Sequence, residues 1–99
     1  MQNKAERLIG LATRAGKIIT GIELCEKAVK TNKAKLIILA RDISESSKKV
    51  FIGSGVDTIY VDSKEKLGKC TGKEVRSVAV ITDSDFSDAV LKAYLNNDM

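Results

Sequence analysis

The 99-residue sequence contains no histidine, and this absence excludes several kinds of active site. Without an imidazole, the chain cannot build a Ser–His–Asp or Cys–His nucleophile system, and nearly every zinc site with nitrogen ligands is excluded as well. Only two cysteines are present, Cys25 and Cys70, too far apart for a Cys-x-x-Cys motif or a four-cysteine zinc site. We therefore expect two reduced, buried thiols and a fold that needs no metal, no cofactor and no disulfide.

Aromatic residues and long hydrophobic runs are also scarce. The chain has four aromatic residues, none of them tryptophan, and its apolar runs, such as Leu36–Ala40 and Val78–Ile81, have the length of strands. The first residues, 1–7, are not followed by the apolar core of a signal peptide. The apolar content of 43% suits a globular domain that builds one core. These features predict a single cytoplasmic domain, residues 1–99, that does not bind a membrane.

Motifs for nucleotide or metal chemistry are incomplete. The segment Gly68–Lys73 has one residue too few between its glycines for a Walker A loop, and no Gly-x-Gly-x-x-Gly occurs. Asp83 and Asp85 could chelate a hard cation, which is the one enzymatic hypothesis that the sequence leaves open. The alternative is that Asp83-Ser84-Asp85 caps the last helix, since Asp and Ser favour that position. We expect no catalytic role.

The positive charge is concentrated in the first half of the chain. Residues 1–41 carry nine Lys or Arg and three acids (9 − 3 = +6), whereas residues 42–99 carry eight and ten (8 − 10 = −2), which gives the net charge of +4. A one-sided basic surface is typical of a protein that binds a phosphate-rich partner. A membrane surface would also attract it, but no basic helix here carries large exposed aromatic residues. The charge pattern therefore favours a nucleic acid.

The spacing of apolar residues predicts an α/β fold. We expect helices over residues 3–14, 22–32, 44–52 (packed through Val50 and Phe51), 63–70 and 84–94, and strands over residues 17–20, 36–40, 58–61 and 77–82. The strand at residues 36–40 is apolar throughout, so we expect it to be central and covered on both faces. Alternating helices and buried strands imply a three-layer α/β/α sandwich with a mixed sheet of about four strands.

The start of the second helix is the most informative segment. The sequence Thr20-Gly21-Ile22-Glu23 predicts a capping box, with Thr20 as N-cap and Glu23 bonding back to it. The residues predicted to be buried by this helix are Ile22, Cys25, Ala28 and Val29.

A glycine in the first turn of this helix also suggests a binding site. A helix N-terminus presents unpaired N–H groups and a partial positive charge, and Gly21 would let a polyanion approach the backbone closely. The same helix carries Lys27 and Lys30. The alternative is an ordinary β–α–β unit with a solvated basic face.

Several segments, taken in order, resemble the ribosomal L-seven-Ae family of RNA-binding proteins, and its short bacterial YlxQ-like branch in particular. The segments that carry this resemblance over essentially the whole chain are Gly16–Gly21, Lys27-Ala28, Ala34–Asp42, Ser63–Gly68 and Val78–Ile81. The resemblance implies an α/β/α sandwich that binds kink-turn RNA, a sharply bent duplex with tandem sheared G·A pairs. RNA of irregular shape is read at such bulges and widened grooves.

The resemblance also implies which residues contact RNA. In the family pattern Gly-x-Asn-Glu-x-x-Lys, Gly21 and Lys27 match the glycine and the lysine, whereas Glu23 and Leu24 stand where the pattern has Asn and Glu. A glutamate can only accept hydrogen bonds, and a leucine side chain makes none. The alternative for these two residues is that Glu23 completes the capping box and Leu24 packs on a neighbour.

The loop before the last strand, Val75, Arg76 and Ser77, would cover the bulged nucleotides. In this interpretation Gly21 gives access to the backbone, Lys27 binds guanine edges or phosphate, and Val75 covers an unstacked base. Further phosphate contacts would come from Lys17, Lys30 and Arg76.

The resulting hypothesis is a monomeric, non-enzymatic protein that binds structured RNA, such as ribosomal RNA or an mRNA element, in or near the ribosome. The alternative from another class is a protein-interaction adaptor of the translation machinery whose RNA site is weakened.

Overall fold

The structure, a computed structural model, describes residues 3–96 of the chain. Within this range the helices are α1 (Lys4–Arg14), α2 (Ile22–Lys30), α3 (Glu45–Phe51), α4 (Lys64–Cys70) and α5 (Ser84–Leu95). The strands are β1 (Ile18–Thr20), β2 (Leu36–Ala40), β3 (Thr58–Val61) and β4 (Val78–Ile81). All nine predicted elements are present, with ends that differ from the prediction by at most two residues. No helix between residues 3 and 96 is both long and apolar enough to cross a membrane.

The strands form one mixed sheet in the order β1-β4-β2-β3. Strand β2 pairs in parallel with β3 and antiparallel with β4, and β1 pairs antiparallel with β4. All five residues of β2 are buried, because this strand has neighbours on both edges and helices over both faces. The predicted central position of residues 36–40 is confirmed.

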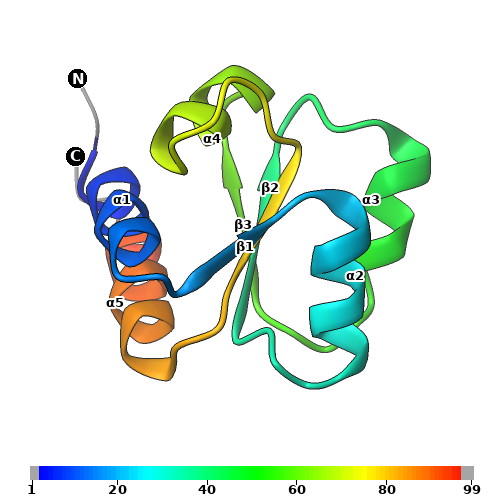
Figure 1. Ribbon diagram of the computed structural model, residues 1–99, viewed down its shortest axis with the longest axis horizontal. Helices are drawn as coiled ribbons and strands as arrows, with labels where there is room; N and C mark the ends of the chain where they lie inside the picture. Colours follow the sequence, from blue (N-terminus) through cyan, green and yellow to red (C-terminus); the bar gives the residue numbers. More distant parts are fainter. Residues whose placement is uncertain (1–2, 97–99) are drawn as a thin grey trace.

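Helices cover both faces of the sheet, as Figure 1 shows. On one face α1, α4 and α5 pack around Ile38, Ile59 and Ile81, and on the other α2 and α3 pack around Ile37 and Val80. The side chains of β2 alternate between these two cores because successive residues of a strand point to opposite faces. The predicted three-layer α/β/α sandwich is confirmed.

Side chains cap four of the five helices in residues 3–96. Asn3 and Glu6 form a capping box on α1, with the Glu6 amide 2.8 Å from Asn3 Oδ1. Ser44 and Ser63 cap α3 and α4. The carboxylate of Asp83 accepts a hydrogen bond from the Phe86 amide at 2.8 Å and so caps α5, which confirms the capping interpretation of Asp83-Ser84-Asp85. Helix α2 is the one helix in this range whose first turn has no capping side chain.

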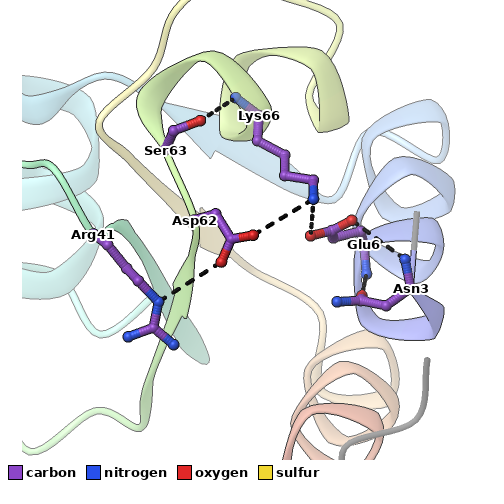
Figure 2. Close-up of polar contacts among 6 residues, drawn as sticks. All are labelled: Asn3, Glu6, Arg41, Asp62, Ser63 and Lys66. Carbon is purple, nitrogen blue, oxygen red and sulfur yellow. Dashed lines mark hydrogen bonds and ion pairs between the residues drawn. The ribbon is translucent and has the colours of Figure 1, made fainter. Parts of the chain in front are cut away.

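An ion-pair network ties α1 to α4 and to the end of β3 (Figure 2). Lys66 Nζ lies 3.5 Å from Glu6 Oε2 and 3.6 Å from Asp62 Oδ2, and Asp62 Oδ1 lies 3.8 Å from Arg41 Nε. The Glu6 side chain is only 5% exposed, so its charge has little contact with water and needs a partner. The carboxylate of Glu6 beside it is the main reason why the pKa of Lys66 is raised.

Candidate nucleic-acid interface

Helix α2 begins at a glycine that offers no capping side chain. Gly21 is the N-cap, with φ 96° and ψ 145°, a backbone conformation that favours glycine. Its own amide donates to the carbonyl of Val78 at 3.3 Å, and its carbonyl accepts the first helical hydrogen bond, from Cys25. The next three amides, those of Ile22, Glu23 and Leu24, donate to no group in residues 3–96. The start of α2 is therefore open to an external acceptor.

The predicted capping box at Thr20 and Glu23 is wrong. Thr20 remains in β1, opposite Ala79 of β4, and the turn into the helix is made one residue later, at Gly21. The Thr20 hydroxyl instead accepts a hydrogen bond from Arg76 Nε at 3.3 Å. As a result the Glu23 side chain has no capping role and is exposed to solvent.

Two apolar side chains of α2 point outward. Leu24 is 62% exposed and belongs to neither core, and Ile22, which was predicted to be buried, is 37% exposed. Cys25 and Ala28 set the buried face of the helix, and the Cys25 thiol lies 3.3 Å from the carbonyl of Ile19. At about 100° per residue, Leu24 lies about 70° and Ile22 about 90° from the centre of that face, so neither side chain is directed into the core.

The loop between α4 and β4 is fixed against α4. A Cβ added to Gly68 would lie 2.5 Å from the carbonyl oxygen of Glu74 and 2.8 Å from the amide nitrogen of Val75, so only glycine permits this approach. The Lys73 amide donates to Gly68 O at 2.7 Å, and the Arg76 amide donates to Lys64 O at 3.0 Å. This contact of Gly68 was not predicted, because a glycine inside a helical pattern does not by itself show which backbone it faces.

This loop presents one apolar and one cationic side chain. Val75 is 48% exposed. The Arg76 guanidinium donates from Nη1 to Val75 O at 2.7 Å and from Nε to Thr20, which orients it beside the end of β1. Ser77 follows, half-buried, directly before β4.

The Arg76–Thr20 and Gly21–Val78 hydrogen bonds join the loop to the start of α2, and Figure 1 shows both segments at the same end of the sheet. We call residues 21–24 and 75–77 together the α2–loop surface. Lys27 is exposed on the next turn of α2 and has no ion-pair partner in the described part of the chain.

Two of the predicted phosphate-contacting residues lie away from this surface. Lys17 lies at the opposite end of β1, where its carbonyl accepts a hydrogen bond from the Thr82 amide. At about 3.3 Å per residue of a strand, it is about 13 Å from Gly21. Lys30 is the last residue of α2, about 13 Å along the helix from Gly21, and forms a 3.5 Å ion pair with Glu26. The other predicted site residues are brought together.

Comparisons with known proteins agree with this architecture. The chain is 34% identical over 88 residues to RNA-binding protein YlxQ of Bacillus subtilis (strain 168). This match covers 85% of this chain and 88% of that relative. A Bacillus pumilus (strain SAFR-032) relative named RNA-binding protein is 39% identical over 72 residues, or 69% of this chain and 88% of the relative.

Two solved structures share the fold. A Bacillus halodurans protein described as having unknown function superposes with a TM-score of 0.87 at 30% identity, over 94% of this chain and 98% of the other. The Giardia lamblia 15.5kD RNA binding protein superposes with a TM-score of 0.74 at 21% identity, over 92% of this chain and 82% of the other. The Ribosomal protein L7Ae/L30e/S12e/Gadd45 family matches residues 3–91, and the chain belongs to that family.

Proposed function

We propose that this chain is a non-enzymatic, monomeric RNA-binding protein of the cytoplasm that recognises structured, kink-turn-like RNA through the α2–loop surface. The observation that carries the proposal is the open start of α2, with three amides that have no acceptor in residues 3–96, beside the exposed Val75. Two relatives named RNA-binding protein support the class of partner, and the family description as ribosomal protein supports an association with the ribosome or with translation.

The chemistry of the surface suits an RNA that is bent and bulged. Backbone amides and the positive end of the α2 dipole favour a phosphate oxygen or a base acceptor at Gly21. Lys27 and Arg76 add positive charge to this part of the molecule, and Arg76 keeps donors beyond the two that it already uses. The apolar side chains of Leu24 and Val75 can cover bases that have left their stack, which a regular A-form duplex does not offer.

The proposal is tested by comparing affinity for a kink-turn oligonucleotide with affinity for a plain duplex of the same length. We expect Lys27→Glu to weaken kink-turn binding by about 2 kcal/mol, because it removes a charge-assisted contact and adds repulsion from phosphate. Lys92→Glu makes the same charge change on α5 and should have little effect. Equal losses for the two variants, or equal binding of both RNAs by the parent chain, would refute the proposed site.

The two departures from the family pattern provide a second test. Replacing both residues (Glu23→Asn with Leu24→Glu) should raise the preference for the kink-turn by about 1–3 kcal/mol, since an amide can hydrogen-bond to base edges and an added acceptor can meet exocyclic amino groups. Because Glu23 caps nothing and Leu24 is exposed, the free energy of unfolding should change little. A folded double variant with unchanged selectivity would show that this helix end does not read base edges.

A protein-interaction adaptor is the second candidate, and one observation favours it. Ile22 and Leu24 are exposed on α2, and Val50 and Ile52 are exposed on or directly after the neighbouring helix α3. Val50 had been predicted to pack in the core, but of the two residues predicted to do so only Phe51 is buried. Exposed apolar side chains on adjacent helices are typical of a surface that binds another protein. An adaptor of this kind should bind a kink-turn no better than a plain duplex.

A further inference from the structure

A second basic surface lies between α1 and the C-terminal end of α4. It is an open groove of about 470 Å³, which we call the α1–α4 groove. Its walls include Arg7 and Arg14 of α1 and Lys69 of α4, and no acidic residue lines it. None of these three cations forms an ion pair with a group in residues 3–96, whereas the nearby Glu6 is buried and paired with Lys66. The groove therefore holds uncompensated positive charge.

The floor of the groove includes a glycine that packing does not require. Gly10 lies inside α1, where glycine costs roughly 1 kcal/mol relative to alanine. A Cβ added there would meet only the carbonyl oxygen of Cys70, at 3.7 Å, which is an ordinary contact. Gly68, by contrast, has no room for one. At Gly10 the missing side chain leaves the helix backbone accessible to a ligand.

The spacing of the charges suits an extended polyanion. Arg7 and Arg14 are seven residues apart on one helix, so they share a face and stand about 10 Å apart along its axis. Lys69 contributes from the opposite wall. Charges at this separation would meet different phosphate groups of one strand rather than a single small anion.

The groove also continues toward the α2–loop surface. Gly72 lines it, and the same loop runs from Gly72 to Val75 and Arg76. A strand of RNA that is held at Val75 and leaves along this loop would reach the groove past Lys73 and past a single acidic residue, Glu74. From charge, open backbone and continuity together, we infer that the α1–α4 groove is a second RNA-backbone site, which holds the sugar–phosphate strand of a stem flanking the bound kink. This inference rests on the proposed function.

The test compares a double variant, Arg7→Gln with Arg14→Gln, against Lys49→Gln with Lys92→Gln, which removes the same charge from exposed positions on α3 and α5. Affinity for a kink-turn oligonucleotide is measured as a function of salt. Loss of two phosphate contacts should lower the log–log slope by about 1.4–1.8, which corresponds to roughly 25-fold weaker binding or more at about 0.1 M salt. The control variant should keep the parent slope. Trimming the flanking stem of the oligonucleotide should weaken binding by the parent chain and leave the arginine variant unaffected.

The outcomes separate the two proposals. If Lys27→Glu weakens binding but the arginine variant behaves like its control, the groove is not a binding site and the α2–loop surface stands alone. Equal sensitivity of parent and arginine variant to the trimmed stem would likewise overturn the inference. If the parent chain binds no RNA, the proposed function and the inference fail together.

Discussion

Replacing Gly68 by alanine should disturb the loop that presents Val75 and Arg76. The added Cβ would lie 2.5 Å from Glu74 O, 2.6 Å from Glu74 C and 2.8 Å from Val75 N, all backbone atoms that cannot rotate away. Restoring ordinary contacts of about 3.5 Å requires the loop to move by about 1 Å. Overpacking of this kind costs roughly 1–3 kcal/mol, and the better helix propensity of alanine returns at most about 1 kcal/mol. With the full gain from helix propensity, we expect a net loss of up to about 2 kcal/mol.

Urea unfolding and amide chemical shifts measure the two consequences. The free energy of unfolding should fall, and the amide resonances of residues 73–76 should shift, since the bonds from the Lys73 amide to Gly68 and from the Arg76 amide to Lys64 hold this loop. Gly10→Ala is the matched control, because it is also inside a helix but meets only one atom, at 3.7 Å. It should stabilise the fold by about 0.5–1 kcal/mol. Equal stabilisation by both substitutions, with unshifted loop resonances, would refute this description of the loop.

Three further predictions concern stability. Burial raises the pKa of Cys25 from 9.0 to about 12 and that of Cys70 from 9.0 to about 11. Because the unfolded chain loses these protons first, the free energy of unfolding should fall above about pH 9, by up to about 1.4 kcal/mol per pH unit for each thiol. A free energy of unfolding in urea that stays constant from pH 9 to about 11 would contradict this. Lys66→Gln should lower the melting temperature more than Lys49→Gln, because it leaves the buried Glu6 carboxylate without its ion-pair partner. Chelator and reductant should leave the melting temperature unchanged, and a large drop with either would mean that the roles of Cys25 and Cys70 are misread.

The regular elements could be predicted from the sequence because local signals and burial agree. The run Leu36–Ala40 is apolar at every position, which suits only a strand covered on both faces, and β2 lies inside the sheet. Asp83 precedes an apolar helical pattern and caps α5 as expected.

The details of the candidate site depend on contacts between segments distant in the sequence, and these could not be predicted. The spacing of Thr20 and Glu23 satisfies the capping-box pattern, but pairing with Ala79 and a hydrogen bond from Arg76 keep Thr20 in β1. The same spacing at Asn3 and Glu6 does form a capping box, which was not among the predictions.

Glycine roles were likewise hidden in the sequence. Whether Gly68 or Gly10 faces another backbone depends on how the loop after α4 folds back, and periodicity carries no information on that. The positions of Lys17 and Lys30, away from the α2–loop surface, follow from the lengths of β1 and α2.

The central claim is that the open start of α2 receives RNA, and amide chemical shifts of the whole chain during titration with a kink-turn oligonucleotide test it most directly. The largest shifts should fall on the amides of Ile22, Glu23 and Leu24, which have no acceptor in residues 3–96, and on those of residues 75–77 in the adjoining loop. Saturating RNA that shifts only amides of α3 or α5, and leaves residues 22–24 unmoved, would contradict it.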